Sequence, residues 1–167
     1  AEGTLVKVPD SLSEDIHDEK TLFLGDNIST GYHGAVCGGI EPGDTVVILG
    51  DGAVGLFATY AATLFEPSKV ITIGHHDNRL NIAKQYGADI TINSNNQGAL
   101  EEIKNLTNGM GADVVIECVG TSECLQEGID LVRAGGPVSF VGLFFEPFPL
   151  NLTDFFLRNL TLRGGVA

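Results

Sequence analysis

The feature that most constrains the fold is a series of short apolar runs between residues 45 and 142, separated by segments with helical spacing. The runs are "TVVIL" (45–49), "VITI" (70–73), "DITI" (89–92), "DVVIEC" (113–118) and "PVSFVG" (137–142). Helical spacing of apolar residues marks segments such as 78–86 and 97–106. Because the runs are apolar almost throughout rather than alternating, they predict parallel strands with helices on both faces.

Right-handed connections between such strands predict an α/β fold with a doubly wound parallel six-stranded sheet, a Rossmann fold, in a single domain. The sixth strand is expected at "LTLRG" (160–164). We expect this domain to cover residues 27–167 and to begin with a helix that ends at Gly38 and Gly39. Residues 1–26 are expected to form a lead-in, with a strand and a loop in "TLVKVPDSLSED".

The chain has 22 acidic and 9 basic residues and a net charge of −13, which disfavours nucleic acid as a partner. No apolar run approaches the roughly 18 to 20 residues that span a bilayer, and the amino terminus lacks the pattern of a secretory signal. These features predict a cytoplasmic protein without a membrane partner. The cysteines Cys37, Cys118 and Cys124 match no disulfide or zinc spacing, which predicts ordinary buried thiols.

The first apolar run is followed at once by "GDGAVG", which places Gly50, Gly52 and Gly55 in G-x-G-x-x-G register. The three glycines would allow a tight turn, close approach of a pyrophosphate, and close packing of helix on strand. The amino terminus of the following helix would then face the anion. With a strand before it and a helix after it, the motif predicts dinucleotide binding; the alternative is a glycine-rich turn that binds nothing.

An acid that holds the ribose 2′-hydroxyl is expected about 20 residues beyond the glycine loop, at the end of the second strand. That place holds Gly74, followed by His75, His76 and Arg79. A carboxylate would repel a 2′-phosphate, whereas glycine leaves room and the three side chains that follow are possible donors. The pattern predicts NADP(H). In the alternative, the histidines are solvated and Asp77 holds a ribose hydroxyl, which favours NAD.

The motifs "GDGAVG", "RLNIAKQYGAD", "TNGMGADVVIECVG" and "RAGGPVSFVG", in this order, resemble the cofactor-binding domain of the zinc-dependent medium-chain alcohol dehydrogenases. The resemblance covers residues 24–167. Glycine at the end of the second strand is the pattern of the NADP-preferring members, whose next residues are often serine and arginine. His75 and His76 depart from that pattern.

The segment "GDNISTGYHGAV" (25–36) carries the position that supplies the third protein ligand of the catalytic zinc in this family, and here it is Asp26. Zinc accepts carboxylate oxygens. The alternative is that Asp26 only caps the helix that begins at Asn27. The resemblance also implies that Thr30 and Val54 contact the nicotinamide ring and that Thr30 has a catalytic role. It implies a cofactor cleft lined by residues that could equally be core: Cys118, Val119, Val141 and Leu143.

The resemblance implies hydride transfer between the nicotinamide and an alcohol, aldehyde or ketone in an intact enzyme, with residues 1–26 leading in from its catalytic domain. Members of this family are longer, so we expect this chain alone to be an inactive fragment without its zinc. The family resemblance also implies a homodimer that forms through the last strands, "FPLNL" (148–152) and "LTLRG" (160–164). The alternatives are a non-catalytic nucleotide-binding or sensing module and a zinc-free quinone oxidoreductase of the same superfamily. A methyltransferase is disfavoured by Gly74, because its sheet usually carries an acid there.

Overall fold

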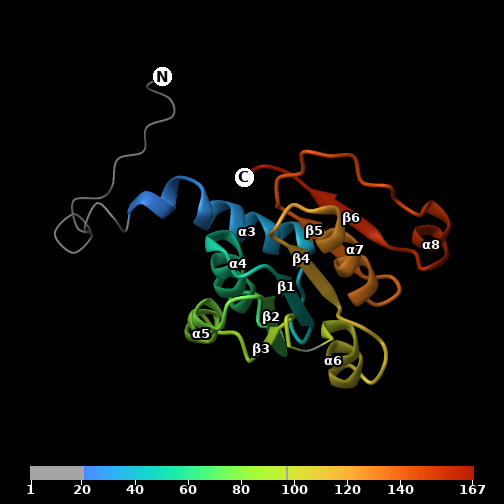
Figure 1. The fold of residues 1–167 in the computed structure, drawn as a ribbon, viewed down its shortest axis with the longest axis horizontal. Helices are drawn as coiled ribbons and strands as arrows, with labels where there is room; N and C mark the ends of the chain where they lie inside the picture. The colour runs from blue at the N-terminus through green and yellow to red at the C-terminus, as the bar shows by residue number, and fades with distance from the viewer. Residues whose placement is uncertain (1–20, 97) are drawn as a thin grey trace.

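The computed structural model describes residues 21–96 and 98–167. They form an α/β domain built on one six-stranded sheet with the strand order β3-β2-β1-β4-β5-β6 (Figure 1). All neighbouring strands are parallel. The strands are β1 (Thr45–Leu49), β2 (Lys69–Gly74), β3 (Ile90–Asn93), β4 (Val114–Glu117), β5 (Pro137–Phe140) and β6 (Thr161–Gly164). This order confirms the predicted doubly wound fold.

Seven helices connect or precede the strands in the described part of the chain. They are the 3-10 helix η2 (Leu22–Gly25) and the α-helices α3 (Asn27–Gly38), α4 (Ala53–Thr63), α5 (Asp77–Gln85), α6 (Ala99–Leu106), α7 (Ser122–Leu131) and α8 (Leu152–Leu157). The helix α3 ends as predicted, because Gly39 adopts the left-handed conformation with φ of 62°. No described helix is long and apolar enough to cross a membrane.

Both faces of the sheet are buried, and successive residues of β1 point to opposite layers. Val46 and Ile48 pack in a cluster with Ala35 of α3 and several alanines of α4. Val47 and Leu49 pack in the other cluster, which includes residues of α6 and α7. Full burial of such aliphatic side chains contributes about 1.5–3 kcal/mol each, so the two layers fix the position of β1 and of its carboxyl end.

The six predicted strands are all present, with ends within two residues of the predicted ones. The helix predicted from residue 97 begins at Ala99, and residue 97 itself lies outside the described residues. The strand and loop predicted for residues 4–15 also lie outside them.

The strand-like interpretation of "FPLNL" (148–152) is wrong. The segment is irregular as far as Asn151, and α8 begins directly after it. The cause is a helix cap, since the Asn151 side chain accepts hydrogen bonds from the backbone N–H groups of Thr153 and Asp154, both at 3.2 Å. Only β6 therefore forms this edge of the sheet.

Candidate functional site

A cavity of about 290 Å³ lies at the carboxyl ends of β1, β2 and β4. The chain leaves β1 and β4 toward opposite faces of the sheet, because α4 packs on one face and α7 on the other. This is the topological switch point, where open α/β sheets bind their ligands. Several residues predicted from the sequence line the cavity, namely Gly50, Gly52, Gly74, His75, His76, Arg79, Cys118 and Val119.

The glycine-rich loop has the geometry that its sequence predicts. Gly50 has a φ of +113°, a conformation that residues with a side chain rarely adopt. A Cβ on Gly55 would lie 2.0 Å from the carbonyl oxygen of Gly50, so only glycine allows α4 to pack this closely on the loop. A Cβ on Gly52 would meet no atom within 4 Å. The backbone at the start of α4 is therefore open to a ligand, and its N–H groups suit a pyrophosphate.

The space beside Gly74 is occupied by Asp51, the second residue of the loop. A Cβ on Gly74 would lie 2.5 Å from the Asp51 Cβ and 2.7 Å from its Oδ2. The expectation that glycine leaves room at this strand end is therefore wrong, because a carboxylate from the neighbouring loop fills that room. Glycine is required here so that the carboxylate can fit.

The Asp51 carboxylate is buried and accepts several hydrogen bonds from the turn after β2. Its Oδ2 accepts from the backbone N–H groups of His75 at 3.0 Å and His76 at 2.8 Å, and from His76 Nδ1 at 3.0 Å. The Arg79 guanidinium lies 3.9 Å from Oδ1. Burial alone would raise the pKa of the Asp51 carboxyl, but the hydrogen bonds from His76 and His75 outweigh it and lower this pKa below its usual value. The carboxylate is ionised at neutral pH.

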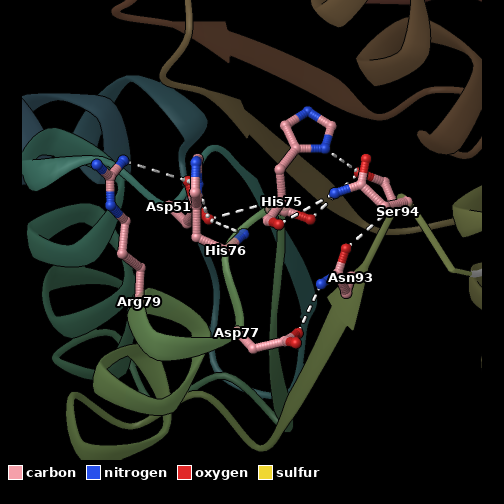
Figure 2. A network of polar contacts seen from close by, with 9 residues as sticks. Asp51, His75, His76, Asp77, Arg79, Asn93 and Ser94 are labelled. Atoms are coloured by element: carbon pink, nitrogen blue, oxygen red, sulfur yellow. Dashed lines mark hydrogen bonds and ion pairs between the residues drawn. The ribbon is translucent and has the colours of Figure 1, made fainter.

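The other side chains of this turn point away from Asp51 (Figure 2). His75 Nδ1 lies 2.8 Å from the hydroxyl of Ser94, which follows β3. Asp77 Oδ1 accepts a hydrogen bond of 2.6 Å from Asn93 Nδ2. Asp77 is therefore engaged with β3 in this structure, and its proposed turn toward a ribose hydroxyl is not seen. Of the two histidines, His75 is the one whose ring is not bonded to Asp51.

Glu117 is a buried carboxyl group at the end of β4 that the sequence analysis did not single out. Its side chain is fully buried, and Oε1 accepts hydrogen bonds of 2.7 Å from the backbone N–H groups of Val119 and Gly120. Among the described residues, no group lies in hydrogen-bond geometry with its Oε2. Burial raises the pKa of Glu117, although the hydrogen bonds from Gly120 and Val119 oppose the rise. An acid at the end of the apolar run "DVVIEC" was the signal that could have revealed it.

The remaining residues predicted for the cleft do not line the cavity. Val141 is half-buried and packs in the same core layer as α3 and α4, and Leu143 is 68% exposed. Val54 and Gly55 belong to the first turn of α4. Two further residues that the sequence analysis did not name, Ser94 and Glu127, line the cavity with Asp51. Cys124, predicted there only as a buried thiol, lines it too.

All three cysteines are free, and each is half-buried. Burial, together with the nearby Glu117 carboxyl, raises the pKa of Cys118 and of Cys124 far above the usual value. These thiols stay protonated at neutral pH, which makes them poor nucleophiles. The third, Cys37, lies on α3 with its Sγ 3.3 Å from His33 Nε2.

The predicted zinc ligand, Asp26, lies at the start of α3 and does not line the cavity. Its side chain accepts no backbone hydrogen bond as a helix cap. Instead, its Oδ1 accepts a hydrogen bond of 2.8 Å from the hydroxyl of Thr30, the other residue predicted to take part in chemistry. The structure therefore brings Asp26 and Thr30 together. It does not support the alternative in which the Asp26 side chain only caps the helix.

Comparison with known proteins gives a family for this arrangement. The family described as zinc-binding dehydrogenase matches residues 53–166, from the first turn of α4 to beyond β6. The chain belongs to the zinc-binding dehydrogenase family. Its relatives include an alcohol dehydrogenase of Cupriavidus necator, 35% identical over 155 residues, which cover 93% of this chain and 41% of that protein.

Two solved structures show the same fold as this zinc-binding dehydrogenase chain. The alcohol dehydrogenase TADH from Thermus sp. ATN1 has a TM-score of 0.87 and 36% identity, covering 97% of this chain and 46% of that one. A putative zinc-binding dehydrogenase from Sinorhizobium meliloti, solved bound to NADP, has a TM-score of 0.79 and 30% identity, covering 84% and 42%. The chain thus spans less than half the length of these relatives.

Proposed function

We propose that this chain is the cofactor-binding domain of a zinc-dependent alcohol dehydrogenase and that it binds NADP(H) more tightly than NAD(H). Residues 27–167 would form the domain and residues 1–26 the lead-in from the catalytic half. The observation that carries the proposal is the cavity at the switch point, bordered by the open backbone of Gly52 at the start of α4. This geometry suits a pyrophosphate flanked by two nucleosides.

The preference for the phosphorylated cofactor rests on the turn after β2. The last residue of the strand, Gly74, has no carboxylate of its own, and His75, His76 and Arg79 all line the cavity beside it. Imidazolium and guanidinium groups form strong hydrogen bonds to phosphate. The relative solved with NADP supports the same choice.

In the intact enzyme we propose hydride transfer between the nicotinamide and a carbon that bears an alcohol or carbonyl oxygen. The Asp26 carboxylate, at the start of α3, suits a zinc ion, since zinc binds carboxylate oxygens. Zinc held there with ligands from the catalytic half would polarise the substrate oxygen as a Lewis acid. Thr30, whose hydroxyl donates to Asp26 at 2.8 Å, would hold that carboxylate in place and lie beside the nicotinamide.

We further propose a homodimer formed at the β6 edge of the sheet. An unpaired strand edge is a template for pairing with another chain, and a twofold contact places the same strand on both partners. Large apolar side chains are exposed in the segments that precede β6, including Phe145 at 85% and Phe156 at 82%. Their burial against a second copy would favour association.

Calorimetric titration of the 167-residue chain with NADP⁺ and with NAD⁺ tests the proposed binding. We expect a dissociation constant for NADP⁺ below that for NAD⁺. Equal or weaker binding of NADP⁺ would overturn the cofactor preference, and failure to bind either nucleotide would overturn the assignment as a cofactor domain and favour a structural role for the glycine loop.

A further inference from the structure

We propose that Asp51 is the specificity-determining residue for the choice between NADP(H) and NAD(H). The inference rests on the proposed nucleotide-binding function and goes beyond it, because it assigns the choice to the glycine-rich loop rather than to the end of β2. Asp51 lines the cavity, and its carboxylate takes the place that a side chain at Gly74 would take. That place is where doubly wound folds position the acid that reads the ribose 2′-hydroxyl.

The first step of the argument is steric. A Cβ on Gly74 would lie 2.6 Å from Asp51 Cγ, so a side chain at the strand end and a carboxylate at position 51 exclude each other. The turn after β2 is nevertheless bound to an acid, because Asp51 Oδ2 accepts both of its first backbone N–H groups. A negative charge thus lies at the end of β2 even though the strand itself carries none.

The second step is the charge balance around this carboxylate. His76 Nδ1 lies 3.0 Å from Oδ2, and Arg79 lies 3.9 Å from Oδ1. From β3 and the residues directly after it, only neutral side chains among the described residues bond to this turn. Ser94 and Asn95 bond to His75, and Asn93 bonds to Asp77. From α7, Glu127 lines the same cavity, and its charge interacts with that of His75. The remaining acid of the turn, Asp77, is bonded to Asn93 instead.

The consequence is that two of the possible donors to a phosphate at this site, His76 and Arg79, already contact Asp51. A 2′-phosphate would have to share them with this carboxylate and would also be repelled by it. A 2′-hydroxyl meets no such penalty, and Oδ1 can accept its hydrogen bond. Asp51 therefore lowers the affinity for NADP(H) relative to NAD(H).

The test is Asp51→Asn, with nucleotide affinities measured by calorimetry at about pH 8, where an ordinary histidine is neutral. We expect the ratio of the NAD⁺ to the NADP⁺ dissociation constant to rise about tenfold, because removal of one nearby like charge is an effect of this order. A purely structural role would change both constants by the same factor and leave the ratio unaltered.

The matched control is Asp77→Asn, which removes a carboxylate from the same turn but from the side that faces Asn93. We expect its ratio to change less than that of Asp51→Asn. Equal changes in the two variants, or an unchanged ratio in Asp51→Asn, would overturn the proposal. Tighter binding of NAD⁺ than of NADP⁺ by the wild-type chain would overturn the proposed cofactor preference alone, since a shifted ratio in Asp51→Asn would still support the role of Asp51. If the wild-type chain bound neither nucleotide, both would fall.

A second measurement decides the matter if Asp51→Asn fails to fold. The same affinities are measured for Asp51→Ser, which also removes the charge but keeps an oxygen that can accept the N–H groups of His75 and His76. We expect the same direction of change in the ratio, because the like charge is absent there too. A raised ratio in Asp51→Ser supports the proposal, and an unchanged ratio overturns it.

Discussion

Substitution of Glu117 by glutamine tests whether this buried carboxyl group is a pH-dependent weak point of the fold. The side chain is fully buried and its Oε1 accepts two backbone hydrogen bonds. Its Oε2 has no hydrogen-bond partner among the described residues. Ionisation would therefore place a charge in the core with only one of its oxygens satisfied. Glutamine keeps the accepting oxygen and cannot ionise.

The direction of the effect follows from proton linkage. Burial raises the pKa of Glu117 in the folded state, whereas in the unfolded chain a glutamate titrates at about 4.3. The stability associated with this group is fully present below about pH 4.3 and is lost as the pH rises through the folded-state pKa. A buried polar group without a partner costs about 1–3 kcal/mol, so we expect Glu117→Gln to gain about this much over the wild type as the pH rises from 4.5 to 8.

Urea denaturation of both proteins, followed by circular dichroism across this range, measures the difference in free energy of unfolding. We compare the two proteins because Asp51, whose pKa is lowered, and Glu127, whose pKa is raised, titrate in both. Their contributions cancel in the difference in free energy of unfolding. A difference that is constant with pH would refute the reasoning. Glu117→Ala provides the contrast, because it leaves the N–H groups of Val119 and Gly120 without their acceptor and should cost about 2–4 kcal/mol relative to Glu117→Gln at every pH.

Three further outcomes are expected. Gly74→Ala should destabilise the domain by about 1–3 kcal/mol in chemical denaturation through its clash with Asp51, and should cost less in an Asp51→Gly background; equal costs would contradict the clash. Elemental analysis should find no stoichiometric zinc in the 167-residue chain, because Asp26 belongs to no cluster of three potential ligands within the described residues, and one zinc per chain would contradict this. Phe145→Lys should weaken the proposed dimer at least tenfold in light scattering without lowering the melting temperature, since this ring is 85% exposed; an unchanged dimer would exclude the ring from the interface.

The central strands could be predicted from the sequence because they are buried on both faces. A strand in this position must be apolar at nearly every residue, as β1 is from Val46 to Leu49. The strand predicted at 148–152 is wrong because the alternating pattern of this segment resembles a strand. Its local structure is decided instead by one side chain that binds the backbone N–H groups. The Asn151 side chain accepts hydrogen bonds from the backbone N–H groups of Thr153 and Asp154 and starts a helix instead.

The glycine loop could be predicted because its requirements are local. Gly50 needs its positive φ for the turn, and Gly55 needs close contact with the carbonyl of Gly50, so the spacing alone carries the information. The position of Asp51 could not be predicted in the same way. Its partners follow a strand that begins 18 residues further along the chain, and only the register of β1 with β2 brings them together.

The pairing of Asp51 with Gly74 shows why the end of the second strand is an incomplete guide to cofactor choice. A glycine there removes a carboxylate from the strand, but it also leaves the space that the loop carboxylate occupies. The two positions therefore act as one site that holds a negative charge supplied by either element. What then distinguishes one nucleotide from another is how the surrounding groups offset that charge, and in this chain the side chains of His76 and Arg79 contact it while the ring of His75 does not. A 2′-phosphate is bound only to the extent that these three side chains outweigh Asp51, so we expect the charge at position 51 to set the cofactor preference against them.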